Sequence, residues 1–433
     1  MHTLDQLKNG SLKGLTALKL SENLSVFPRE IFDLVDTLEV LDLSGNCLTA
    51  LPADFGRLKK LRIFFCSTNL FTVLPEVLAD CPLLDIVGFK ANQIEKIPAA
   101  SLNPNLRWLI LTDNRIAELP SEIGNCQKIQ KLMLAGNRLT ALPEALASCS
   151  NLSLLRISAN KLSELPDWLL SMPRLSWLAF SGNTFSTHPA INPLPVVAWD
   201  DLTLSRVLGE GASGVIYQAS SRTEKSTGDV AVKVFKGEVT SDGLPEDEMN
   251  AYITAGHHPG LVALLGRIAG HPEGKGGLVM ELIPEKFFNL GMPPSLESCT
   301  RDVFKPGQTL SLRQSLKIAE TIASLAAQLH RKGIMHGDLY AHNILVDQDG
   351  NALFGDFGAA SFYDLNDGKR SFALERLEVR AFGYLLDDLL SICTESAGQT
   401  TSIKLRELCE RCLAPDIHLR PGFQYLEAEL RRL

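Results

Sequence analysis

Three polar residues at short spacings carry the strongest chemical signal in the sequence. Asp338 and Asn343 lie in a turn between two apolar runs, and Asp356 lies in a second turn, Gly-Asp-Phe-Gly. Phosphoryl transfer requires a carboxylate that orients the attacking hydroxyl and oxygen ligands that hold Mg2+ against the phosphates. Asp338 suits the first task, and Asn343 with Asp356 suits the second. Each residue taken alone would also fit an ordinary polar turn at the surface.

A glycine-rich stretch and a lysine precede these turns. The glycines are Gly209, Gly211 and Gly214. Glycine lets the backbone approach phosphates closely, and the strand-like run that follows disfavours a dinucleotide-binding fold, which would continue into a helix. Lys233 ends the motif Val-Ala-Val-Lys, and a helix predicted over 244–253 carries Glu248. We expect Glu248 to pair with Lys233, and the neighbouring Glu246 and Asp247 to lie at the surface.

The order of these motifs resembles the protein-kinase superfamily over roughly Trp199 to Leu433. The resemblance implies ATP and Mg2+ as ligands. It assigns the acceptor hydroxyl to Asp338 and the phosphates to the pair of Lys233 and Glu248. It assigns the Mg2+ ligands to Asn343 and Asp356.

The resemblance also implies an adenine pocket. The apolar run 278–283 is similar to the hinge strand of kinases. Met280 would then border the adenine, and backbone groups of Glu281 and Ile283 would hydrogen-bond to the base. Apolar side chains would enclose the purine from its two faces, Leu345 on one face and Leu208, Ile216 and Ala231 on the other.

Three departures from the kinase pattern leave the acceptor open. Gly337 stands where many protein kinases have an arginine, so a phosphate on the activation segment would find no obvious charge to pair with. Only about twenty residues separate Asp356 from 378–383, which look like the start of the large core helix. Tyr340 stands where serine/threonine kinases have a lysine that contacts phosphate.

These features predict a protein kinase that acts on serine or threonine. Without the usual arginine, we expect activity that does not depend on phosphorylation of Ser361, Tyr363 or Ser371. The motif His-Gly-Asp-x-x-x-x-Asn also occurs in small-molecule phosphotransferases similar to aminoglycoside kinases, which gives one alternative. A tyrosine acceptor and an inactive pseudokinase that only binds partners are the others. The pseudokinase is disfavoured because the lysine, both aspartates and the asparagine are all present.

The first half of the sequence repeats the template Leu-x-x-Leu-x-Leu-x-x-Asn-x-Leu-x-x-Leu-Pro. Its first positions are Leu15, Leu38, Leu61, Leu84, Leu106, Ile129, Leu152 and Leu175. The pattern resembles the leucine-rich repeat. The alternating leucines predict short strands that stack into one parallel sheet, with the asparagines forming a ladder that satisfies backbone groups.

The predicted fold class is therefore an α/β repeat solenoid followed by an α+β bilobal protein-kinase-like domain. We assign a solenoid of about eight repeats to 1–190, a proline-rich joint to 191–201 and the kinase-like domain to 202–433.

Outward-facing strand positions are expected to form a concave surface that binds a protein substrate or regulator. Its apolar and aromatic members are Phe65, Ile86, Trp108, Ile110, Met133 and Trp177. The alternative is that these side chains pack on one another or on the kinase-like domain.

Bulk properties exclude several classes of partner. The formal net charge of -8 gives no electrostatic reason to expect nucleic acid or an anionic membrane surface. No apolar run is long enough to span a bilayer, and the first residues lack a hydrophobic signal core. The nine scattered cysteines suit a reduced, cytoplasmic protein better than a disulfide framework.

Overall fold

The computed structural model describes residues 2–186, 194–211, 213–223, 226–237, 239–240, 242–394 and 400–433. It divides into two compact units. The first holds Met1–Leu175 and Asn183–Phe185, and the second holds Ser176–Gly182 and Ser186–Leu433. Pro189, the last proline of the repeat pattern, and residues 191–193 of the predicted joint lie outside the described residues.

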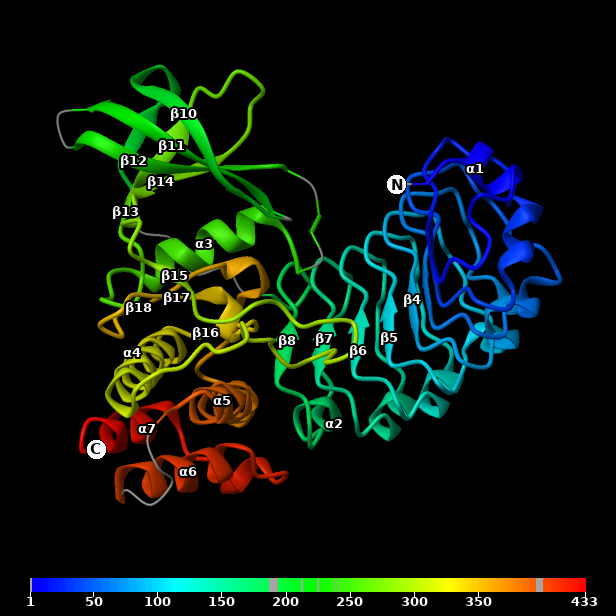
Figure 1. Ribbon diagram of the computed structural model, residues 1–433. Helices are drawn as coiled ribbons and strands as arrows, with labels where there is room; N and C mark the ends of the chain where they lie inside the picture. The colour runs from blue at the N-terminus through cyan, green and yellow to red at the C-terminus, as the bar shows by residue number, and fades with distance from the viewer. Residues whose placement is uncertain are drawn as a thin grey trace. The chain divides into compact units, whose positions relative to one another are not determined.

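The first unit contains a parallel sheet to which successive repeats each add one short strand (Figure 1). The strands are β1 (Ala17–Lys19), β2 (Val40–Asp42), β3 (Ile63–Phe65), β4 (Ile86–Gly88), β5 (Trp108–Ile110), β6 (Lys131–Met133) and β7 (Leu154–Arg156). The central residue of each strand is buried, as at Leu18, Leu41 and Phe64. Because side chains alternate along a strand, the two leucines of each Leu-x-Leu step enter the core on the same side.

The chain returns from each strand through a short helix. Six of these are 3-10 helices, over Arg29–Leu34, Phe55–Arg57, Glu76–Asp80, Ala99–Ser101, Ser121–Asn125 and Glu144–Ser148. The seventh is α2 (Asp167–Leu170), and a separate helix, α1 (Leu4–Lys8), begins the unit. A proline occupies the N-cap of most of these return helices, for example Pro75 and Pro143. Its fixed φ and missing N–H suit the residue that ends an extended stretch before a helix.

The asparagines of the repeat form the predicted ladder. The side-chain amide of Asn137 donates to the carbonyl oxygens of Leu111 at 2.9 Å and Leu134 at 2.8 Å. Its oxygen accepts from the N–H of Ile116 at 3.1 Å. The same bonding recurs at Asn69, Asn92, Asn114 and Asn160. Buried backbone groups need partners, so this ladder ties each repeat to the one before it.

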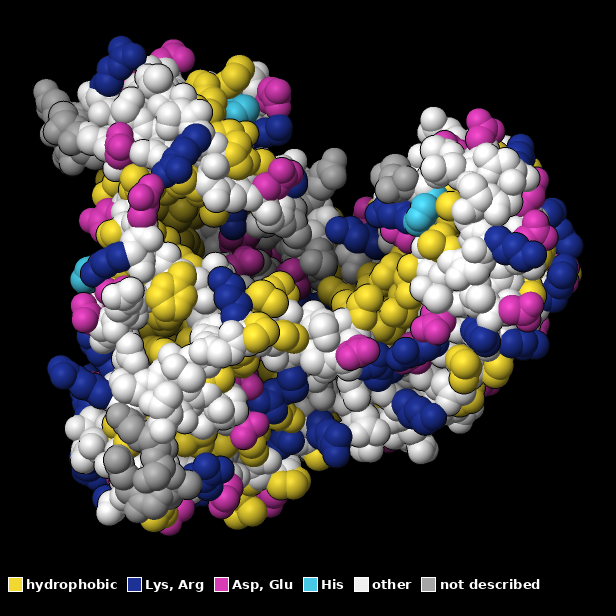
Figure 2. Space-filling model, in the orientation of Figure 1, with side chains coloured by type: hydrophobic (Ala, Val, Ile, Leu, Met, Phe, Trp, Pro, Cys, Tyr) yellow, Lys and Arg dark blue, Asp and Glu magenta, His cyan; other side chains and the backbone are white. Residues whose placement is uncertain are grey.

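Hydrophobic side chains gather on the surface of the repeat unit that Figure 2 shows. Four members of the predicted concave surface are half-buried, namely Phe65, Trp108, Ile110 and Met133. Trp108 donates from its indole N–H to the sulfur of Met133 at 3.3 Å, and the Lys131 ammonium lies 4.5 Å from the centre of its ring. The prediction is wrong for Ile86, which is fully buried between Ile63 and Trp108 of the adjacent strands.

A six-stranded sheet forms one part of the second unit. In spatial order its strands are β10 (Leu202–Glu210), β11 (Gly214–Thr223), β12 (Ser226–Phe235), β14 (Gly277–Glu281), β13 (Leu264–Ala269) and β9 (Val196–Ala198). All neighbours are antiparallel except β9, which runs parallel to β13. Part of the predicted joint thus forms an edge strand, with Val197 buried in the core of the sheet. Helix α3 (Pro245–Ala255) begins at the predicted proline.

The remainder of the second unit is mainly helical (Figure 1). Its helices are α4 (Leu312–Arg331), α5 (Gly368–Ser391), α6 (Thr400–Cys412) and α7 (Phe423–Leu430). Two small sheets lie beside them, one of β15 (Phe288–Asn289), β17 (Ile344–Val346) and β18 (Ala352–Phe354), and one of β16 (Ile334–Met335) and β19 (Ser361–Phe362). In the part of the chain that the structure describes, no helix combines the length and the apolar character needed to cross a bilayer.

Helix α4 precedes the turn that carries Asp338. Ser311 and Gln314 form a capping box at the start of α4. The predicted start of the large core helix is wrong. Helix α5 begins at Gly368 and not at residue 378. The carboxylate of Asp367 accepts from the N–H of Arg370 at 3.0 Å, and this cap starts the helix earlier than the apolar pattern indicates.

Candidate active site

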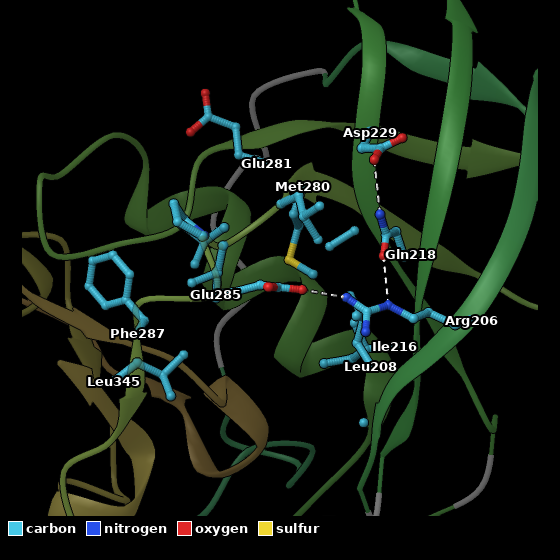
Figure 3. A pocket seen from close by; sticks show the side chains of 16 residues that line it. Arg206, Leu208, Ile216, Gln218, Asp229, Met280, Glu281, Glu285, Phe287 and Leu345 are labelled. Atoms are coloured by element: carbon cyan, nitrogen blue, oxygen red, sulfur yellow. Dashed lines mark hydrogen bonds and ion pairs between the residues drawn. The ribbon is translucent and has the colours of Figure 1, made fainter. Parts of the chain in front are cut away.

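A cavity of about 630 Å³ lies in the second unit between the strands of the six-stranded sheet and Leu345 of β17 (Figure 3). All of the residues predicted to contact adenine line it, namely Leu208, Ile216, Ala231, Met280, Glu281, Ile283 and Leu345, together with Gly209. Its size and largely apolar wall are those of a pocket for a planar organic ligand.

A row of polar side chains along the same cavity was not predicted. Arg206 donates to Glu285 at 3.0 Å and to Gln218 at 2.9 Å, and Gln218 donates to Asp229 at 2.9 Å (Figure 3). Arg206 of β10, Gln218 of β11 and Asp229 of β12 each lie two positions along the strand from a residue that was predicted to contact adenine. Side chains two apart share a strand face, so this spacing was the available signal.

The glycine-rich turn joins β10 to β11. The N–H of Gly211 donates to the carbonyl of Gly214 at 2.9 Å. A Cβ at Gly214 would lie 2.5 Å from the carbonyl oxygen of Val234, so a side chain there would collide with β12. Lys236 donates to Gly211 O at 3.1 Å and to Glu210 at 2.7 Å. The turn is thus held against the neighbouring strand.

Lys233 of β12 and Glu248 of α3 form a hydrogen-bonded ion pair. Only 13% of the lysine side chain and 4% of the glutamate side chain are exposed. Burial raises the pKa of Glu248 above its ordinary value, and the attraction of Lys233 opposes that rise. Asp247, which was expected at the surface, is also buried.

Phe357 packs the Gly-Asp-Phe-Gly turn against α3. Its ring stacks on Tyr252 of α3 with the ring centres 4.8 Å apart, and lies 4.9 Å from the ring of His336. The preceding Asp356 is exposed, in a left-handed conformation with φ of 56°. Its carboxylate accepts from the N–H of Gly358 at 3.2 Å. The helix that carries the glutamate of the ion pair therefore packs directly on the turn that carries Asp356.

The structure brings the polar residues of the two turns together. The amide of Asn343 donates to the carboxylate of Asp338 at 2.8 Å and to its carbonyl oxygen at 3.0 Å. The carbonyl of Asn343 accepts from the N–H of Gly355 at 3.1 Å, next to Asp356 in sequence. Asp338 is half-buried, so its carboxylate is both held and accessible.

Two acidic residues that sequence reasoning missed hold this loop. Glu378 of α5 accepts from the backbone N–H groups of His336 at 3.1 Å and Gly337 at 2.7 Å, and from His330 at 2.7 Å. Burial favours its neutral form, but the hydrogen bond and charge of His330 prevail and hold the pKa of Glu378 below its ordinary value.

Asp302 holds the other end of the loop. Its carboxylate accepts from the N–H of His342 at 2.9 Å and lies 2.8 Å from Nδ1 of the same residue. Asp302 belongs to the stretch between β15 and α4, which contains no recognisable motif. Only the folded chain brings it to the catalytic loop.

The three hydroxyl residues on whose phosphorylation the activity is not expected to depend all make structural contacts. Ser361 is fully buried in β19, and its hydroxyl donates to the carbonyl of Ala359 at 3.3 Å. The hydroxyl of Tyr363 lies 2.7 Å from Nδ1 of His330. Ser371 lies inside α5 and donates to the carbonyl of Asp364 at 2.9 Å. Replacing all three together would therefore disturb packing.

The prediction that Trp177 belongs to the exposed concave surface is wrong. This residue is 1% exposed, groups with the second unit and stacks on Tyr340 of the catalytic loop. It is therefore not available to an external partner in this arrangement.

Residues 202–380 match the family described as protein tyrosine and serine/threonine kinase. Residues 104–162, 127–185 and 37–58 match leucine-rich repeat families. Fibroblast growth factor receptor 1 of Xenopus laevis is 30% identical over 176 residues, which are 38% of this chain and 21% of that protein.

Two further relatives match part of this chain. Tyrosine-protein kinase receptor TYRO3 of Danio rerio is 28% identical over 222 residues, 49% of this chain and 25% of that protein. Leucine-rich repeat and calponin homology domain-containing protein 1 of Mus musculus is 31% identical over 132 residues, 30% of this chain and 18% of that protein. The matches thus span a quarter or less of each relative. The chain thus carries leucine-rich repeats followed by a domain that matches the protein tyrosine and serine/threonine kinase family.

Proposed function

We propose that the second unit transfers the γ-phosphoryl group of ATP to a serine or threonine hydroxyl of a protein, with Mg2+ as cofactor. The observation that carries the proposal is the linkage of the two polar turns. Asn343 contacts Asp338 through its side chain and Gly355 through its backbone. One set of hydrogen bonds therefore links the carboxylate proposed to orient the acceptor hydroxyl with the turns that carry the proposed metal ligands.

The nucleotide would bind with its adenine in the apolar cavity and its phosphates toward Lys233. An ammonium group held by Glu248 is suited to neutralise phosphate charge, because the ion pair fixes the position of the lysine. Met280 and Ala231 lie opposite each other on paired strands and would contact the base.

The residues present suit Mg2+, which prefers carboxylate and amide oxygens. Asn343 uses its amide nitrogen for Asp338, which leaves its side-chain oxygen as a metal ligand, and the exposed carboxylate of Asp356 is the second. Bound Mg2+ would neutralise charge that develops on the transferred phosphate. Asp338, held by Asn343, would orient the acceptor hydroxyl.

A tyrosine acceptor is a second candidate. Tyr340 replaces the lysine of serine/threonine kinases, and its ring is buried against Trp177, so this position offers no cation to the phosphate. The relative from Danio rerio is named as a tyrosine-protein kinase.

We also propose a protein-binding role for the repeat unit and a cytoplasmic location. The exposed parts of Phe65, Trp108, Ile110 and Met133 support the first proposal. Within the described residues all nine cysteines are free, and most are buried, which supports a reducing compartment.

The test is transfer of label from γ-labelled ATP, with Mg2+, by the purified full-length chain incubated with a mixture of proteins. Asp338→Ala and Lys233→Ala are compared with Asp33→Ala, which removes an exposed aspartate of the first unit. We expect label on serine or threonine, lost in the first two variants and kept in the third.

Other outcomes separate the alternatives. Label on tyrosine would support the second candidate. Label only on small-molecule acceptors, screened in parallel, would overturn protein phosphorylation. Absence of ATP binding would overturn phosphoryl transfer altogether.

A further inference from the structure

The segment Ser176–Gly182, which the repeat pattern counts with the first half of the chain, belongs to the second unit. Its strand β8 (Trp177–Ala179) carries an indole that is almost completely buried. The indole N–H of Trp177 donates to the carbonyl of Leu339 at 3.0 Å. Leu339 directly follows Asp338, so this bond restrains the backbone of the catalytic loop beside its carboxylate.

The same indole lies within an aromatic stack. Its ring centre is 4.4 Å from that of Tyr340, with the two planes 6° apart, and 5.3 Å from that of Tyr384 of α5, with the planes 16° apart. Stacked rings bury a large apolar area and restrict one another's orientation. The indole thereby connects Tyr340 of the catalytic loop to Tyr384 of α5.

The segment also restrains the strand that follows the Gly-Asp-Phe-Gly turn. The N–H groups of Phe180 and Ser181 donate to the hydroxyl of Ser361 at 2.9 and 3.2 Å. Ser361 pairs with Met335, which lies immediately before the catalytic loop. One short segment therefore holds both the catalytic loop and the start of the activation segment.

Gly337 shows that this arrangement excludes the arginine common in kinases. Its φ is +75°, and a Cβ built on it would lie 2.6 Å from the carbonyl oxygen of Leu178 and 2.7 Å from that of Ala359. Both clashes are with backbone, so no side chain fits while Leu178 is in place. The position of the segment Ser176–Gly182 therefore requires glycine, and not arginine, at residue 337.

We propose that Trp177 is a positioning residue that holds the catalytic loop, and with it Asp338, in the geometry required for phosphoryl transfer. In this chain the segment Ser176–Gly182 replaces the phosphate and arginine pair that restrains the loop in other kinases. The indole contacts Leu339 and Tyr340, whereas Asp338 stays partly accessible, so the contact supports the carboxylate without covering it. This inference rests on the proposed phosphotransferase function.

The test uses the full chain with Trp177→Ala, Trp177→Phe and the control Trp168→Ala, which removes a half-buried tryptophan from α2 of the first unit. The turnover number, the KM for ATP and the melting temperature are measured for each. We expect Trp177→Ala to lower kcat by about ten- to a hundredfold, since small misplacements of catalytic groups have effects of this size. The KM for ATP should change less than about twofold, because the indole is outside the adenine cavity.

Trp177→Phe keeps one aromatic ring for the stack but loses the five-membered ring of the indole with its N–H, so it should recover part of the loss. Trp168→Ala should leave kcat within about twofold of wild type. An unchanged or increased kcat in Trp177→Ala would overturn the inference, and an increase would identify the contact as inhibitory. Equal losses in the two alanine variants would overturn it as well, because they would indicate a general loss of stability.

Hydrogen exchange of the backbone amides at 336–343 separates this inference from the proposed function, because it requires no turnover. Faster exchange at these amides in Trp177→Ala, or in Trp177→Phe if the alanine variant does not fold, supports the restraint. Unchanged exchange contradicts it. Failure of the wild-type chain to transfer phosphate would instead contradict the proposed function.

Discussion

The asparagine ladder of the repeat unit and Asn343 of the catalytic loop place the same residue type in two different settings. Asn137 is buried, and it bonds to backbone groups of its own and the preceding repeats. Asn343 is half-buried, and its amide bonds to the carboxylate of Asp338. An asparagine bonded to backbone fixes the fold, whereas one bonded to the side chain of an aspartate in an accessible loop is positioned for chemistry. Substitutions at the two positions should therefore affect different observables.

Asn343→Ala should have the largest effect on transfer. It removes a proposed metal ligand and the hydrogen bond that orients Asp338, so we expect phosphoryl transfer to fall by about a hundredfold or more. The melting temperature should change little, because the side chain is only half-buried. Transfer rates at increasing Mg2+ check this, and a wild-type rate at low Mg2+ would contradict the assigned role.

Asn137→Ala should do the opposite. It leaves the N–H of Ile116 without its side-chain partner, at a cost of about 1–3 kcal/mol if water cannot reach it. The carbonyls of Leu111 and Leu134 lose one donor each but still accept from Asn114 and Asn160. We expect a loss of about 1–3 kcal/mol in the free energy of unfolding of the first unit, measured by urea denaturation. Transfer per folded molecule should stay within about twofold of wild type. A selective loss of transfer without a loss of stability would contradict the assignment of Asn137 to the stability of the fold.

Glu378→Gln tests the restraint on the catalytic loop through pH. Because the pKa of Glu378 is lower in the folded chain than in the unfolded one, its carboxylate stabilises the fold above the unfolded pKa of about 4.3. This contribution is lost as the pH falls below that value. The variant should thus be less stable than wild type at neutral pH, by about 1–3 kcal/mol, and the difference should shrink under acid conditions. A difference that stays constant from pH 7 to pH 3 would be inconsistent with the ionised carboxylate.

Arg206→Ala should have the smallest effect. Arg206 and Glu285 line the cavity, but 62% and 89% of their side chains are exposed, and exposed ion pairs contribute about 0–1 kcal/mol. The KM for ATP should rise less than about threefold. A larger rise would mean that Arg206 contacts the nucleotide directly.

Much of the fold could be predicted because its signals are local and repeated. The 23-residue period determines the strands and the asparagine ladder, and short motifs identify Lys233, Asp338 and Asp356. The start of α5 was missed because Asn366-Asp-Gly368 has the composition of a turn, although Asp367 caps the helix.

The restraints on the catalytic loop could not be predicted because their partners are distant in sequence. Glu378 follows Gly337 by 41 residues, and Leu339 follows Trp177 by 162. The repeat period predicts only that Trp177 lies on the outward side of its strand. What covers that side depends on the tertiary fold.

The most direct test of this account measures ATP binding and phosphoryl transfer on the same samples of wild type and Asp338→Asn. The substitution keeps the shape of the side chain and removes its charge. We predict that the variant binds ATP with an affinity within about threefold of wild type, because the cavity and Lys233 are intact, and that transfer falls by about a hundred- to ten-thousandfold. Transfer at the wild-type rate by Asp338→Asn would contradict the assignment of this loop as the catalytic centre.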